Sequence, residues 1–95
     1  MRRAARKDLA QHPIVDELRI CGVTVFILNQ ERLPDLLCGF RNRMWLLEVK
    51  HPPGPRGGQP GQSTPDQEEF SRTWRGPPVH IVHSIQEAKA VLGIR

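Results

Sequence analysis

Apolar residues recur at helical spacing in the first part of the chain and then give way to a β-branched run. The spacing predicts a helix from Asp8 that ends at Gly22, where glycine suits the left-handed C-terminal cap. Pro13 falls in the first turns of this helix, where a missing N–H costs least. The following run, Val23–Leu28, predicts a strand. The apolar helix positions are Ile14, Val15, Leu18 and Cys21.

A hairpin is predicted next. A short strand at Asp35–Phe40 leads into the polar run Arg41–Arg43, which predicts a turn, and Met44–Lys50 predicts the third strand. A turn centred near Asn42 pairs position i with about 84 minus i. This register places the first residue of the second strand opposite Val49.

The segment 51–63 is rich in the two residues that break regular structure. It holds four of the nine prolines and four of the eight glycines, so we expect a flexible loop. Thr64 then marks the start of a second helix as its N-cap, with Pro65 in the first turn and Gln67 completing a capping box. We expect this helix to run to about Trp74.

The C-terminal part predicts one more strand and one more helix. Val79–His83 alternates in polarity, as in a strand. Ser84 and Glu87 have the spacing of a second capping box, and Gly93 ends the helix that follows. The apolar positions of that last helix are Ile85, Ala88, Val91 and Leu92.

The predicted element order is αβββαβα. It indicates an α/β (α+β) fold in which a small mixed sheet is flanked by helices. The helix between the third and fourth strands is a crossover, so these two strands are expected to be parallel neighbours. A chain of 95 residues is long enough for one core, so residues 8–95 are expected to form a single domain.

The net charge of +4 comes from the first seven residues. They hold four of the fourteen basic residues and no acid, so the other 88 residues carry ten charges of each sign. We interpret residues 1–7 as a basic arm, either one that binds phosphates or a solvated terminus. The basic residues of the arm are Arg2, Arg3, Arg6 and Lys7.

Several classes of protein are excluded by composition. No apolar run approaches the roughly 20 residues of a membrane-spanning helix, so no membrane partner is expected. The charged N-terminus has no apolar segment after it, so no secretion signal is expected either. The two cysteines, Cys21 and Cys38, are then predicted to be reduced core residues of a cytoplasmic protein in a bacterial or phage-infected cell.

Charged residues gather at one end of the predicted hairpin. Glu48 and Lys50 share a face of their strand because residues two apart point the same way, and Asp35 lies across from them. Two carboxylates attract a hard divalent cation, and an ammonium beside it can stabilise charge on a phosphate. The alternative is a surface Glu–Lys pair on an edge strand without function. The apolar character of the strand favours an interior position and a functional role.

Pro34-Asp35, twelve residues and then Glu48-Val49-Lys50 resemble the PD-(D/E)xK motif of the restriction-endonuclease-like nucleases. The order αβββαβ is the minimal core of that superfamily. Within that superfamily, the chain resembles the small stand-alone VRR-NUC nucleases of phages and bacteria. Further similarity lies in the segment STPDQEEF and in the closing strand with Ser84–Ala88.

The resemblance implies a role for each matching residue. Asp35, Glu48 and the backbone carbonyl of Val49 are then ligands of Mg²⁺ or Mn²⁺, and Lys50 positions or activates the attacking water. Gln67 matches a glutamine near the scissile phosphate or the lysine. Such enzymes usually add an acid from the first helix. Asp8, Asp16 and Glu17 are all available for this position, and Asp8 or Gln11 lies where the family pattern begins. Asp8 and Glu17 are the candidates for the metal ligand.

These residues lead us to expect a metal-dependent endonuclease that hydrolyses DNA. The resemblance extends the expectation to branched DNA of the Holliday-junction type and to a homodimer with two active sites. Arg41, Arg43 and Arg56 are candidates for phosphate contacts beside the basic arm. Two other classes stay open, a non-catalytic nucleic-acid-binding protein on the same fold and a protein that binds or inhibits another protein.

Overall fold

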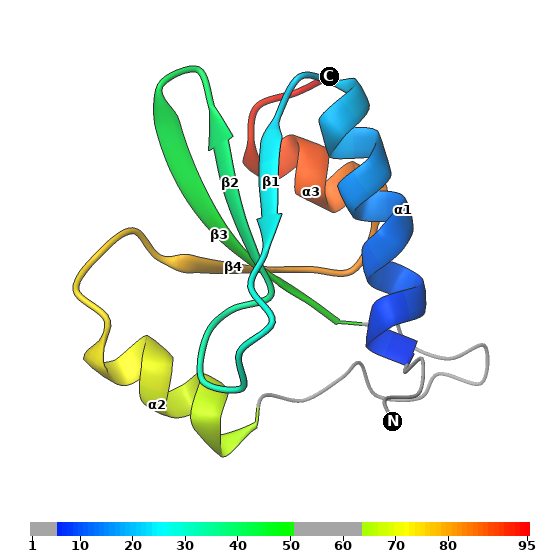
Figure 1. Ribbon diagram of the computed structural model, residues 1–95. Helices are drawn as coiled ribbons and strands as arrows, with labels where there is room; N and C mark the ends of the chain where they lie inside the picture. The colour runs from blue at the N-terminus through cyan, green and yellow to red at the C-terminus, as the bar shows by residue number, and fades with distance from the viewer. Residues whose placement is uncertain (1–5, 51–63) are drawn as a thin grey trace.

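The computed structural model describes residues 6–50 and 64–95, with side chains from Gln11 onward. The predicted order of three helices and four strands is confirmed within these residues (Figure 1). The predicted loop 51–63 and residues 1–5 of the predicted arm lie outside them. The elements are α1 (Arg6–Ile20), β1 (Thr24–Ile27), β2 (Leu36–Phe40), β3 (Arg43–Val49), α2 (Pro65–Thr73), β4 (Val79–Val82) and α3 (Ile85–Val91).

The four strands form one mixed sheet in the order β1-β2-β3-β4. The pairs β1–β2 and β2–β3 are antiparallel, whereas β3 and β4 are parallel. This confirms the prediction that the crossover through α2 joins two parallel neighbours. The fold class predicted from the sequence, a small α/β protein with a mixed sheet and helices, is therefore confirmed.

The predicted register of the hairpin is wrong by one residue. Leu36 pairs with Leu47 rather than with Glu48, its predicted partner. Continued by one position, this register places Asp35 across from Glu48 rather than Val49. The reason is the turn, which has two central residues rather than three. Arg41 and Asn42 take positive φ angles of 52° and 65°, as in the tight turn that matches the twist of a hairpin.

One face of the sheet carries the hydrophobic core. Alternate residues of every strand point to this face, and α1 and α3 cover it on the right of Figure 1. The core therefore holds the first and last helices to the sheet. Its buried members include Ile14, Val15, Leu18, Val25, Leu36, Cys38, Leu47, Val49, Val82, Ala88 and Leu92.

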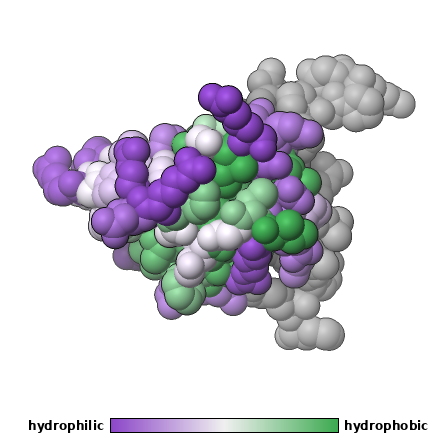
Figure 2. Space-filling model, turned by 90° about the horizontal axis from the view of Figure 1, so that it is seen from above, coloured by the Kyte–Doolittle hydropathy of each residue, from purple (hydrophilic) through white to green (hydrophobic). Residues whose placement is uncertain are grey.

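The opposite face is only partly covered. It carries Glu48 and the exposed apolar residues Phe26, Met44 and Ile81, and α2 lies beside it without burying any residue of its own. Figure 2 looks down on the end of the molecule that carries the β2–β3 turn, where apolar surface gathers near the middle and hydrophilic side chains surround it. The two faces thus differ in both packing and polarity.

Local signals set most of the helix ends. Gly22 has a φ of 91° and follows α1 as predicted, with the N–H of Val23 donating to Leu18. However, α1 starts at Arg6, so two residues assigned to the arm are helical. Pro13 consequently lies in the interior of α1, not in its first turns.

The two predicted capping boxes have different outcomes. At α2 both halves form between Thr64 and Gln67, as predicted. At α3 the Ser84 hydroxyl accepts from the N–H of Glu87, but the Glu87 carboxylate accepts from the N–H of His83 instead of Ser84. Only half of the second box is therefore correct.

None of the helices in the described part of the chain is long and apolar enough to cross a bilayer.

Candidate active site

Asp35 is tied to the end of β3 by a backbone hydrogen bond. The N–H of Val49 donates to Oδ2 of Asp35 at 2.7 Å, although Asp35 precedes the first residue of β2. The carboxyl residue is buried, with 8% of its surface exposed. The hairpin thus brings Asp35 to the strand end that carries Glu48 and Lys50, as the sequence predicts.

Glu48 and Lys50 are buried charges on the same face of the sheet. Their exposed fractions are 3% and 7%, and Nζ of Lys50 lies 4.0 Å from Oε2 of Glu48. Moving a carboxylate or an ammonium out of water costs several kcal/mol, roughly, unless partners compensate for it. The pair is therefore not the surface ion pair that the sequence left open as an alternative.

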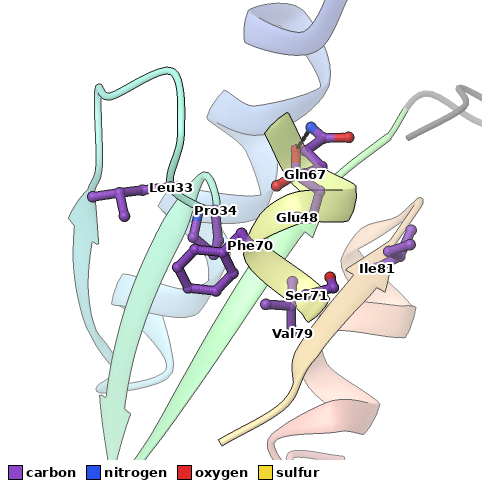
Figure 3. Close-up of a pocket in the computed structure, with 8 residues that line it drawn as sticks. All are labelled: Leu33, Pro34, Glu48, Gln67, Phe70, Ser71, Val79 and Ile81. Atoms are coloured by element: carbon purple, nitrogen blue, oxygen red, sulfur yellow. Dashed lines mark hydrogen bonds between the residues drawn. The ribbon is translucent and has the colours of Figure 1, made fainter. Parts of the chain in front are cut away.

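Gln67 supplies the compensating hydrogen bonds from α2. Its Oε1 accepts from Nζ of Lys50 at 2.6 Å, and its Nε2 donates to Oε2 of Glu48 (Figure 3). The same Oε1 accepts from the N–H of Thr64 at 2.9 Å as part of the capping box. One amide therefore joins the first turn of α2 to Glu48 of β3 and to Lys50, which follows that strand.

A small pocket opens beside these residues, between α2 and the sheet. Glu48 and Gln67 meet at one end of it, and the ring of Phe70 lies beside Pro34 (Figure 3). Its walls are mainly apolar, a common property of ligand sites with a few polar groups. The lining residues are Leu33, Pro34, Glu48, Gln67, Phe70, Ser71, Val79 and Ile81.

The donor set of this site suits a hard cation. Asp35 and Glu48 offer carboxylate oxygens, and the carbonyl of Val49 belongs to the same strand end. Mg²⁺ is commonly held by one or two carboxylates and keeps several waters. Among the side chains that the structure describes, no group of three acids, histidines or cysteines gathers to hold a metal. Two carboxylates are thus what these residues provide.

The first-helix candidates have separate outcomes. The side chain of Asp8 lies outside the described residues. Glu17 faces α3, where its Oε2 accepts from Nζ of Lys89 at 3.3 Å and from the thiol of Cys21 at 3.7 Å. Glu17 is thus bonded within the α1–α3 contact. Gln11, one turn before the core residues of α1, is buried with 8% exposed.

Two of the predicted phosphate-binding arginines, Arg41 and Arg43, are not brought to the site. Arg41 lies in the hairpin turn, and Arg43 is the first residue of β3, about 17 Å along the strand from Glu48. Their guanidinium groups lie over the rings of Phe40 and Trp45. The side chains of Arg2, Arg3, Arg6, Lys7 and Arg56 lie outside the described residues.

Cys38 matches its predicted role as a core residue. It is fully buried, and burial raises the pKa of its thiol to about 11. A thiol with this pKa stays protonated at neutral pH and is a poor nucleophile. The chemistry available to the site therefore comes from its carboxylates, its lysine and its glutamine.

Two pocket residues escaped the sequence analysis. Pro34 was used only to recognise a motif, although it is buried beside the site. Phe70 had no assigned role, yet the helical spacing of three from Gln67 places both on one side of α2. That spacing was the available signal for Phe70.

Comparison with known proteins yields no relative, because no family model, no curated protein and no solved structure matches the chain. Functional inference therefore starts from the geometry of Asp35, Glu48, Lys50 and Gln67.

Proposed function

We propose that this protein is a metal-dependent DNA endonuclease with a restriction-endonuclease-like core of the VRR-NUC type. The observation that carries the proposal is the buried contact of Gln67 with both Glu48 and Lys50, next to Asp35. Asp35, Glu48 and Lys50 are positions that match the PD-(D/E)xK motif. Burial of two opposite charges costs desolvation free energy. Their retention at a strand end beside a pocket therefore favours a chemical role for them.

The two carboxylates have the chemistry to bind Mg²⁺ or Mn²⁺. A cation bound there would lower the pKa of a coordinated water and neutralise charge on the phosphate. Asp35 is oriented for this task by the N–H of Val49, and Glu48 is oriented by the amide of Gln67. The ammonium of Lys50 lies next to the carboxylates, where it can orient water or stabilise developing negative charge.

The substrate proposed is DNA, with branched DNA of the Holliday-junction type as the first candidate. Cleavage of two strands by so small a protein requires two active sites, which a twofold homodimer supplies. The basic residues 1–7 add sequence-independent attraction to phosphates. Support for the branched substrate is the motif resemblance alone.

The decisive experiment combines cleavage with metal binding. The wild-type protein is incubated with four-way junction, flap, single-stranded and duplex DNA in the presence of Mg²⁺ or Mn²⁺. Manganese binding is measured by calorimetry on the same preparation. We expect cleavage of at least one substrate and saturable Mn²⁺ binding.

Glu48→Gln tests the assignment of the ligand. We expect loss of cleavage and of Mn²⁺ binding, while DNA binding is retained or becomes tighter because a negative charge near the phosphate is removed. Glu69→Gln is the matched control, since Glu69 lies exposed on α2 in contact with Arg72. DNA binding by the wild type without metal binding or cleavage would instead establish a non-catalytic binding protein.

A further inference from the structure

The antiparallel ladder between β2 and β3 stops one step before the candidate site. In a hairpin with a two-residue turn, the closing pair exchanges two hydrogen bonds, and every second pair does the same. Phe40–Arg43, Cys38–Trp45 and Leu36–Leu47 are these pairs. The next one in the series would join residue 34 to Val49.

Residue 34 is a proline and has no N–H to donate. The N–H of Val49 is instead bound to the Asp35 carboxylate. The carbonyl of Val49 points to the same side of the strand, toward the place where a ladder N–H would be. Pro34 therefore removes the ladder donor that this carbonyl would otherwise receive.

The neighbouring strand on the other side does not replace that donor. Backbone groups alternate in direction along a strand, and the N–H of Lys50 donates to the carbonyl of Val82 on β4. The backbone N–H and C=O of Lys50 thus point to β4, and those of Val49 point to β2. On the β2 side, the N–H of Leu28 donates to the carbonyl of Asp35, so Asp35 in turn directs its own backbone to β1.

We propose that Pro34 is a positioning residue that ends the β2–β3 ladder and leaves the Val49 carbonyl oxygen available to a divalent cation or to its bound water. The inference rests on the proposed metal-dependent function. An ordinary residue at position 34 would extend the ladder by one pair. Its N–H would then compete with the cation for the same oxygen.

Pro34 also contributes packing to the pocket, because its ring is buried and lies beside Phe70 (Figure 3). Pro34→Ala removes this packing and adds an N–H at the same time. The two effects are separated by a full-length semisynthetic protein with the same methyl side chain, in which the peptide link before residue 34 is an ester. This protein lacks both the ring and the N–H.

Manganese affinity of the three proteins is measured by calorimetry. We expect Pro34→Ala to weaken Mn²⁺ binding by about tenfold, the effect of one competing hydrogen bond. The ester protein is expected to bind within about twofold of the wild type, because the competing donor is absent. Equal affinity of the alanine and ester proteins would overturn the inference and leave the proposed function intact.

A second measurement needs no metal. In metal-free Pro34→Ala, the new N–H at position 34 should be protected from hydrogen exchange, because it donates to the Val49 carbonyl. Rapid exchange of this N–H would show that the ladder does not extend and would overturn the inference. A wild-type protein that binds no Mn²⁺ would overturn the proposed function together with this role for Pro34.

Discussion

Helices α1 and α2 lie against the same sheet but are held to it in different ways. α1 inserts Ile14, Val15 and Leu18 into the core, where each is at most 2% exposed. α2 buries no residue, and its polar link to the sheet is Gln67. Phe70 of α2 stacks on Trp74, the residue that follows the helix, with ring centroids 5.0 Å apart.

The difference separates stability from chemistry within one small sheet. Burial of an aliphatic side chain contributes roughly 1.5–3 kcal/mol, whereas a net hydrogen bond contributes about 0.5–1.5 kcal/mol. The free energy of folding therefore comes mainly from the face under α1 and α3. The face beside α2 carries the buried charges, and α2 can be loosened without unfolding the sheet.

Leu18→Ala is expected to have the largest effect on stability. Leu18 is fully buried between α1 and the sheet, so its truncation should reduce the free energy of unfolding by about 2–5 kcal/mol. Urea unfolding followed by circular dichroism measures the change. Phe70→Ala is the counterpart in α2 and should reduce the free energy by less than about 1.5 kcal/mol, because Phe70 is only partly buried. Equal losses would contradict the comparison.

Lys50→Ala should affect catalysis more than folding. We expect single-turnover cleavage at saturating Mg²⁺ to fall by at least ~10²-fold, which corresponds to about 2.7 kcal/mol in the barrier. Metal binding should survive because an ammonium is not a metal ligand. Lys50→Arg should not restore the rate fully, since a planar guanidinium does not fit the place of an ammonium.

The control for Lys50 is Lys89→Ala. Lys89 also pairs with a glutamate, Glu17, but it does so in the α1–α3 contact. Its removal should leave the cleavage rate unchanged. A folded Lys50→Ala protein that cuts as fast as the wild type would show that the motif match arose by chance.

Gln67→Ala should loosen α2 selectively. Loss of the bonds to Lys50 and Glu48 should raise hydrogen exchange of the α2 amides by about tenfold, while the α1 amides stay as protected as before. Native-state hydrogen exchange with mass spectrometry resolves the two helices. Gln86→Ala, at an exposed glutamine of α3, is the control. Faster exchange in both helices would mean that they unfold as one unit.

The smallest expected effect concerns the start of α3 and depends on pH. Hydrogen bonds from the side chain and backbone of His83 lower the pKa of Glu87 below its usual 4.5. A lowered pKa stabilises the folded state above the unfolded value, and this contribution is lost as the pH falls through the folded value. Glu87→Gln should therefore lower the Tm slightly at pH 7. The two proteins should converge as the pH falls through the lowered pKa of Glu87 in the folded state.

A difference that persists unchanged at a pH low enough to protonate Glu87 in the folded state would show that the Glu87 charge is not responsible. The effect should stay below about 0.5 kcal/mol, because the Glu87 side chain is 51% exposed and solvent screens its interactions.

Local patterns were sufficient for much of the architecture. Helical spacing of Ile14, Val15 and Leu18 predicted the buried side of α1, and the Thr64–Gln67 capping box predicted the start of α2. These features depend on residues a few positions apart. The predictions of the start of α1 and of the second capping box were wrong for the same reason. Each segment has more than one acceptable local arrangement.

The structure brings the predicted residues Asp35, Glu48, Lys50 and Gln67 together, whereas the sequence predicted neither the pocket beside them nor the geometry of their contacts. The strand pattern placed Glu48 and Lys50 on one face, which the structure confirms. The register was wrong by one residue because it depends on the turn type, and two positive φ angles at Arg41 and Asn42 are not evident from the polarity pattern. Burial of the charges could not be inferred, since it depends on what α2 places over them.

The element order, the parallel β3–β4 crossover, the apolar face of α1 and the residues at the end of the hairpin could all be predicted from the sequence. All of these follow from periodicity and from the steric limits on chain connections. The contact of Gln67 with Glu48 and Lys50, which lie 19 and 17 residues earlier in the chain, depends on the tertiary structure. So does the register of β2 and β3, whose continuation by two positions places Pro34 opposite Val49. Such contacts join segments that are distant in sequence, and their geometry depends on how the whole core packs.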